Sequence, residues 1–226
     1  MSLVEKQAAA ATGQVSLAHA WKEIMEKFGL NIAQILLAPD DTETRRKHLN
    51  ARATLLKLIE LQVIPVINEN DTVSTEEIRF GDNDRLASRV AQISSADCLI
   101  LLSDVNGLYS KDPKLDNKAR LIREIKNINH KVENLASQKT GEFGSGGMKT
   151  KIDAAKICQF SGCHMAIANG LINRPIQKIM MKVVDGKYVD NEIKSELKRL
   201  SKNYKGYKNY LIAELIALIS ALNRGF

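Results

Sequence analysis

Short, continuously apolar segments alternate with stretches of helical periodicity along most of the chain, and this alternation constrains the fold more than any other feature. Strands buried on both faces are predicted at residues 32–37, 63–67, 98–102 and 165–168. Helices are predicted over residues 17–28, 49–61, 86–94 and 148–160. Such an order favours an α/β fold, with a mainly parallel sheet covered by helices on both faces.

Polar residues follow directly on two of the predicted strands. Asn68, Glu69, Asn70 and Asp71 come after the second strand, and Ser103-Asp104 follow the third. Ligands in open α/β sheets bind beyond the carboxyl ends of the strands, so these residues are candidates for a binding site. The alternative is turn chemistry, because Asn and Asp side chains readily close turns and cap helices.

Two further clusters open predicted helices. The glycine-rich run Gly144-Ser145-Gly146-Gly147 precedes residues 148–160, where a helix N-terminus and the nearby Lys149 and Lys151 suit a phosphate. A flexible loop before a helix is the alternative. The run 81–84 precedes the helix at residues 86–94. An acid in this run could orient lysines around a phosphoryl group or hold Mg²⁺. The alternative is that it only caps the helix.

Bulk properties exclude several classes of protein. Four of the seven excess positive charges lie in residues 182–226, which indicates a solvated basic tail rather than a nucleic-acid-binding face. Three cysteines, Cys98, Cys158 and Cys163, with no second ligand pair, favour reduced thiols and no metal site. Residues 2–12 carry charge where a leader would be apolar, and residues 211–222 are too short to span a bilayer. We therefore expect a cytoplasmic protein with no membrane contact.

Together the clusters resemble the amino acid kinase family, and most closely its glutamate-phosphorylating members. The resemblance covers roughly residues 4–180. It rests on AAAATGQ, VIPVINENDTVSTEEIRFGDNDRLA, ADCLILLSDVNGLYSKDP and GSGGMKTKIDAA, which occur in the family's order and approximate spacing. It implies an αβα sandwich around a mainly parallel open sheet. It also implies transfer of phosphate from ATP, with Mg²⁺, to the side-chain carboxylate of L-glutamate, the first step of proline synthesis.

The resemblance also assigns roles to residues. It implies catalytic roles for Lys151, at the transferred phosphate, and for Asp84, which organises the active-site lysines. Glutamate contacts are implied for Asp71, Asn83 and the neighbouring Asn68. ATP contacts are implied for Ser103, Asp104, Ser145, Gly146, Gly147, Met148, Lys149, Thr150 and Lys151.

The sequence departs from the family pattern at both ends. The family's opening strand, its Lys-x-Gly-Ser loop and a second strand have no counterpart here, so we expect an N-terminally incomplete kinase domain over residues 1–181 with impaired catalysis. Residues 182–226 are expected to form a basic helical extension, whose apolar face at 211–222 is a candidate contact for a homo-oligomer. A non-catalytic nucleotide-binding remnant, or an aspartokinase-like or uridylate kinase-like activity, is the alternative.

Overall fold

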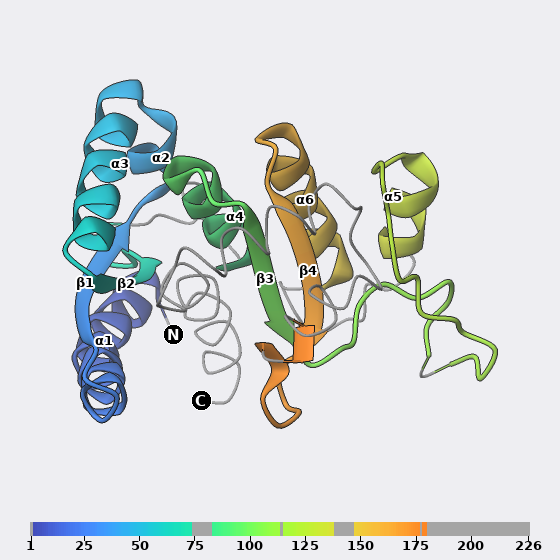
Figure 1. The fold of residues 1–226 in the computed structure, drawn as a ribbon, viewed down its shortest axis with the longest axis horizontal. Helices are drawn as coiled ribbons and strands as arrows, with labels where there is room; N and C mark the ends of the chain where they lie inside the picture. Colours follow the sequence, from blue (N-terminus) through green and yellow to red (C-terminus); the bar gives the residue numbers. More distant parts are fainter. Residues whose placement is uncertain (1, 74–82, 114, 138–146, 177, 180–226) are drawn as a thin grey trace.

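The computed structural model describes residues 2–73, 83–113, 115–137, 147–176 and 178–179. Figure 1 shows the arrangement of its helices and strands. In chain order these are α1 (Leu3–Glu26), β1 (Asn31–Leu37), α2 (Pro39–Glu43), α3 (Arg45–Glu60), β2 (Val63–Glu69), α4 (Asn83–Ser94), β3 (Cys98–Ser103), α5 (His130–Ser137), α6 (Met148–Phe160) and β4 (His164–Asn169).

The strands form two parallel pairs. β1 pairs with β2 from Asn31 opposite Val63 to Leu37 opposite Glu69, and β3 pairs with β4 from Cys98 opposite His164. Within the described ranges, each pair is a separate two-stranded sheet. The parallel pairing confirms the α/β prediction, and it brings the carboxyl ends of β1 and β2 together, as it does those of β3 and β4.

Helices pack against both faces of the β1–β2 pair, as a layered α/β fold requires. On β2, Ile64 and Val66 pack against Trp21 and Met25 of α1, whereas Ile67 points into a different cluster. That second cluster joins β2 and β3 through α4 and α6. Its buried members are Leu37, Leu55, Ile67, Leu86, Ala87, Val90, Ala91, Ile93, Leu99, Leu101, Ala154, Cys158 and Cys163. Because α4 packs between β2 and β3 in this cluster, the position of its first residues is fixed by the core.

Most predicted elements are confirmed to within a few residues, and α6 matches its predicted range. The first helix begins at Leu3, well before the apolar periodicity at Leu17 starts. A capping box explains the early start: Ser2 Oγ accepts from the Glu5 backbone amide at 3.3 Å, and the Glu5 carboxylate accepts from the Ser2 amide at 2.6 Å. The short helix α2 and the helix α5 were not predicted.

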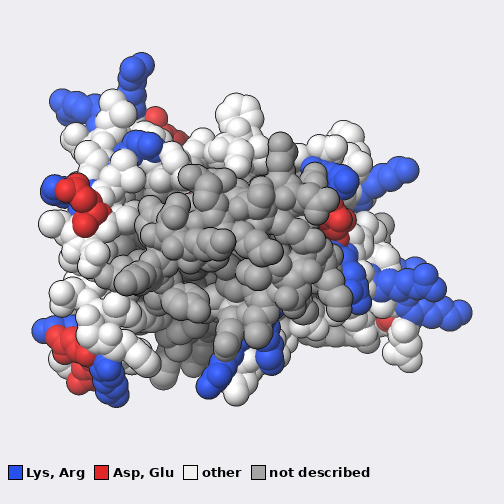
Figure 2. Space-filling view, viewed as in Figure 1, with Lys and Arg blue, Asp and Glu red and all other residues white. Residues whose placement is uncertain are grey.

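Charged side chains lie in several separate groups on the described surface. Figure 2 shows Lys and Arg side chains in separate groups around the rim of the molecule, with Asp and Glu among several of them. None of the helices in the described part combines the length and the apolar character that a membrane crossing requires. The predicted extension at 182–226, with its apolar face at 211–222, lies outside the described residues.

Candidate functional site

The first turns of α4 and α6 meet at a buried ion pair. Lys151 Nζ lies 2.8 Å from Asp84 Oδ2, and the side chains are only 3% and 2% exposed. Thr150 Oγ1 donates a second hydrogen bond to Asp84 Oδ2 at 3.1 Å. The pair joins residues 67 positions apart because α4 and α6 pack directly against each other. Two polar clusters that are distant in sequence therefore form one site.

The position of Lys151 is electrostatically unusual. A helix N-terminus carries partial positive charge, so an acid is favoured there and a lysine is disfavoured by about 0.3–1 kcal/mol. Asp84 in the first turn of α4 follows this preference, whereas Lys151 in the first turn of α6 opposes it. Burial adds a desolvation cost that only a well-bonded partner offsets. The N-terminus of α6 carries partial positive charge beside this pair, which suits an anionic ligand.

Gly147 is the N-cap residue of α6. Its φ of −84° and ψ of −172° are open to any residue, so the backbone does not require glycine. A methyl group added there would meet no other described atom within 4 Å. Thr150 Oγ1 donates to the Gly147 carbonyl at 2.8 Å, which ties the cap to the residue that contacts Asp84. Among the described residues, no atom would obstruct a ligand that approaches the backbone closely at Gly147.

The remaining residues predicted to contact ATP divide between two places. Met148 is buried and packs with Ile152 of α6, whereas Lys149 is exposed. At the end of β3, Ser103 is buried, and its Oγ donates to Asp104 Oδ1 at 3.0 Å. The Ser103 carbonyl accepts from the Gly170 amide at 2.7 Å, which ties the ends of β3 and β4 together. Ser145 and Gly146 lie outside the described residues.

The residues predicted to contact glutamate lie at the end of β2 and the start of α4. Asn68 is buried, and its Nδ2 donates to Gln14 Oε1 of α1 at 2.9 Å. Asp71 and Asn83 flank residues 74–82, which are not described. Asp71 lies at the surface, yet surrounding atoms desolvate its carboxylate and raise its pKa above the usual value. A cationic group bound beside Asp71 would favour the ionised carboxylate and offset this desolvation.

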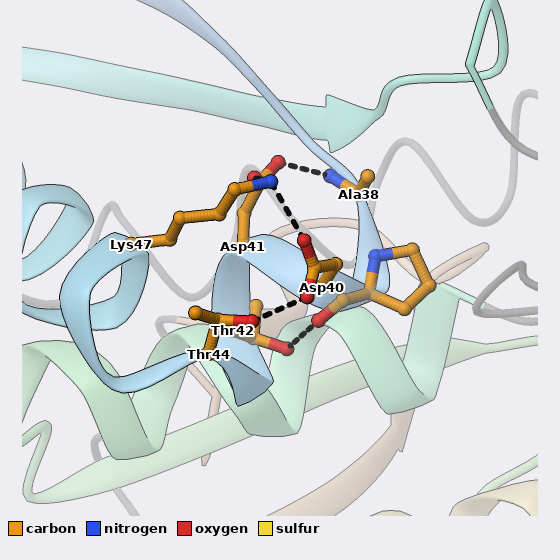
Figure 3. A network of polar contacts seen from close by, with 7 residues as sticks. Ala38, Asp40, Asp41, Thr42, Thr44 and Lys47 are labelled. Atoms are coloured by element: carbon orange, nitrogen blue, oxygen red, sulfur yellow. Dashed lines mark hydrogen bonds and ion pairs between the residues drawn. The ribbon is translucent and has the colours of Figure 1, made fainter.

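A second polar network follows β1 at the same edge of the sheet, because the Asn70 amide donates to the Leu37 carbonyl at 2.9 Å. Figure 3 shows the network. Lys47 Nζ reaches Asp40 Oδ2 at 2.7 Å and Asp41 Oδ1 at 3.2 Å. Its hydrogen bond lowers the pKa of Asp40 and raises that of Lys47. Asp41 Oδ2 also accepts from the Ala38 amide at 2.8 Å, so this network fixes the start of α2.

The described residues form no cluster of metal-binding side chains at the site. In the ranges that the structure describes, no group of three or more His, Cys, Asp or Glu side chains is placed to hold an ion. The Asp84 carboxylate is already bonded to Lys151 and Thr150. Mg²⁺ typically binds through substrate phosphates, waters and one or two carboxylates, so the described residues fit a magnesium ion that enters with a nucleotide.

Sequence reasoning missed Gln14 as a partner of Asn68. Gln14 is the last residue of AAAATGQ, but its sequence neighbours gave no indication of which side chain it would meet. The available signal was its position three residues before Leu17, on the helix face that packs against the sheet. A half-buried amide on such a face needs a hydrogen-bonding partner.

Comparisons with known proteins show the family to which the chain belongs. Residues 1–169 match the model of the amino acid kinase family. Over 179 residues, 79% of this chain, the sequence is 57% identical to the glutamate 5-kinase of Pelagibacter ubique (strain HTCC1062). It is 53% identical to that of Paramagnetospirillum magneticum (strain ATCC 700264 / AMB-1) and 51% identical to that of Rhodopseudomonas palustris (strain BisB5), over the same share of this chain.

These alignments cover 49%, 48% and 48% of the three relatives, so the chain spans about half the length of the curated relatives it matches. The family model nevertheless covers most of the chain. It includes β2, β3 and the helix pair that carries Asp84 and Lys151. The family resemblance inferred from the sequence motifs is confirmed: the chain belongs to the amino acid kinase family.

Proposed function

We propose that this chain catalyses phosphoryl transfer from ATP to the side-chain carboxylate of L-glutamate. The observation that carries the proposal is the buried Lys151–Asp84 pair, 2.8 Å long, at the meeting point of two helix N-termini. A buried ion pair is weak support for stability, since apolar residues of similar volume often serve as well. Its presence at an electropositive helix end is better explained by the binding of phosphate.

In phosphoryl transfer the protein mainly has to position the two substrates and to supply positive charge around the transferred group. A carboxylate oxygen of glutamate attacks the terminal phosphorus of ATP as the bond to the ADP oxygen breaks, which gives an acyl phosphate and ADP. Negative charge on the transferring group is balanced by Lys151 and by the backbone amides at the start of α6. Asp84 acts on Lys151, because its carboxylate holds the ammonium group in place.

The other residues divide between the two substrates. Ser103 and Asp104, at the carboxyl end of β3, contact the nucleotide together with residues 145–151. Asn68, Asp71 and Asn83 contact glutamate, with the desolvated Asp71 carboxylate facing its ammonium group. Support comes from the relatives, all three of which bear the name glutamate 5-kinase. Mg²⁺ enters with ATP and neutralises phosphate charge when bound.

The reaction implies the remaining partners and the setting. ATP and L-glutamate are the small-molecule partners, the product feeds proline synthesis, and we place the reaction in the cytoplasm. Neither a membrane nor a nucleic acid is needed. A homo-oligomer is proposed only on the apolar pattern of residues 211–222 in the sequence.

A coupled assay of ADP release tests the proposal, with glutamate, aspartate and UMP compared as acceptors. Glutamate should give the highest rate, and added hydroxylamine should trap the acyl phosphate as a hydroxamate. ADP release without hydroxamate would mean ATP hydrolysis instead of transfer. Equal rates with aspartate or UMP would overturn the choice of substrate, and no ADP release with any acceptor would overturn the proposed activity of this chain.

A further inference from the structure

The carboxamide of Asn68 is held by a side chain from a distant part of the sequence. Asn68 Nδ2 donates to Gln14 Oε1 at 2.9 Å, across 54 positions, and Asn68 itself is only 5% exposed. Gln14 lies in α1, which packs along β1 and β2 (Figure 1). The bond therefore links the interior of a helix to the carboxyl end of a strand.

Gln14 and Asn68 are polar side chains at the end of an apolar contact between α1 and β2, here called the seam. Ile64 and Val66 of β2 face α1, and Asn68 follows on the same face because strand side chains alternate. On the helix, Leu17 and Trp21 fill the seam, and Gln14 lies one turn before Leu17. Two apolar side chains in place of Gln14 and Asn68 would bury no polar group and so would carry no desolvation cost. Two amides here must instead satisfy each other, which indicates a role beyond packing.

The bond fixes which way the Asn68 carboxamide points. The nitrogen and oxygen of a carboxamide lie on opposite sides of the group, so holding Nδ2 against α1 turns Oδ1 away from α1. A carbonyl oxygen is an acceptor only, and among the groups of an amino acid it selects the ammonium over the carboxylates. Without Gln14, the amide is free to turn and offer its N–H groups instead.

We propose that Gln14 is a positioning residue for the amino acid substrate, holding the Asn68 carboxamide so that Oδ1 accepts a hydrogen bond from the substrate's α-ammonium group. This role rests on the proposed function, because it requires glutamate to bind beside Asn68. It makes Gln14 a determinant of specificity for α-amino dicarboxylates over dicarboxylates that lack the amine. Gln14 itself does not contact the substrate.

The test compares glutamate with glutarate, which has the same two carboxylates and no ammonium group. Calorimetric titration of the full chain gives the ratio of the two dissociation constants. In Gln14→Met, which keeps the length of the side chain and removes the acceptor, glutamate should bind about 10- to 100-fold more weakly, as expected for a lost hydrogen bond to a charged group. Glutarate binding should stay unchanged. Gln14→Glu retains the acceptor oxygen and should keep the wild-type ratio.

Other outcomes overturn the assignment in distinguishable ways. An unchanged ratio in Gln14→Met, or equal weakening of both ligands, would show that Gln14 does not orient Asn68 for the ammonium group. If the wild-type chain binds neither ligand, the proposed function fails before Gln14 is tested.

A pair of compensating variants gives an independent check should Gln14→Met not fold. Asn68→Asp alone should bind glutamate, since Gln14 can turn and donate its Nε2. Asn68→Asp combined with Gln14→Glu places two carboxylates together and should lose glutamate binding. Binding by the double variant as tight as by each single variant would contradict the proposal.

Discussion

Replacing Lys151 with methionine is expected to destabilise the fold strongly. The Asp84 carboxylate is 2% exposed and would lose the ammonium group that lies 2.8 Å away. Removing one partner of a buried ion pair typically costs about 3–5 kcal/mol, because the other charge stays buried without compensation. The hydrogen bond from Thr150 remains, so we expect the lower half of that range.

Urea unfolding and thermal melting both measure this loss. For a chain of this size, each kcal/mol lowers Tm by about 2–4 °C, so Lys151→Met should melt roughly 6–16 °C below the wild type. Lys156→Met is the matched control. Lys156 lies on the same helix and pairs with Glu133 at the same 2.8 Å, but its side chain is 43% exposed. Its loss should change stability little, because solvent screens an exposed pair.

The comparison can refute the reasoning directly. A Lys151→Met variant that unfolds at the same urea concentration as Lys156→Met would show that burial of the pair has no energetic consequence. The double variant Asp84→Leu with Lys151→Met removes both charges, and most of the lost stability should return. If the pair serves phosphate binding, the double variant should fail to bind Mg-ATP even though its stability has returned.

Three further variants test other parts of the chain. The raised pKa of Asp71 means that its ionised form is disfavoured in the fold, so its contribution to stability is lost as pH rises through that pKa. Asp71→Asn should abolish this pH dependence in a series of melts and weaken glutamate binding at neutral pH. Gly147→Ala should leave Tm nearly unchanged yet weaken Mg-ATP binding, because its methyl group meets no described atom and would occupy the ligand's space. Gly107→Ala should lower stability by about 1–3 kcal/mol in urea unfolding, since φ is +142° and the added carbon would lie 3.2 Å from Leu121 Cδ1.

The sequence was sufficient to predict the parallel strands and the helices that follow them. Buried parallel strands leave short continuous apolar runs and amphipathic helices leave a periodic pattern, and both are visible in the sequence. The strand at 63–67 was predicted although Pro65 lacks a backbone donor. The start of α1 was missed, since it depends on a cap at Ser2 and not on periodicity. The helix α5 was missed because it is short and is held by packing of Ala136 against residues of α6.

The candidate site was predictable as a set of residues but not as a set of contacts. Polar clusters at strand ends and a glycine-rich helix start pointed to Asp84 and Lys151 separately. Their contact depends on the packing of α4 against α6, and this packing cannot be predicted from local sequence patterns. The bond between Gln14 and Asn68 likewise depends on tertiary structure, because its partners lie 54 positions apart in the sequence.

A crystal structure of the chain with glutamate and a non-hydrolysable Mg-ATP analogue tests the central claim most directly. We expect the terminal phosphate within hydrogen-bonding distance of Lys151 Nζ and of the backbone amides that begin α6. The side-chain carboxylate of glutamate should point at that phosphate from the side of Asn68 and Asp71. A triphosphate bound elsewhere, with Lys151 still paired only to Asp84, would contradict the account.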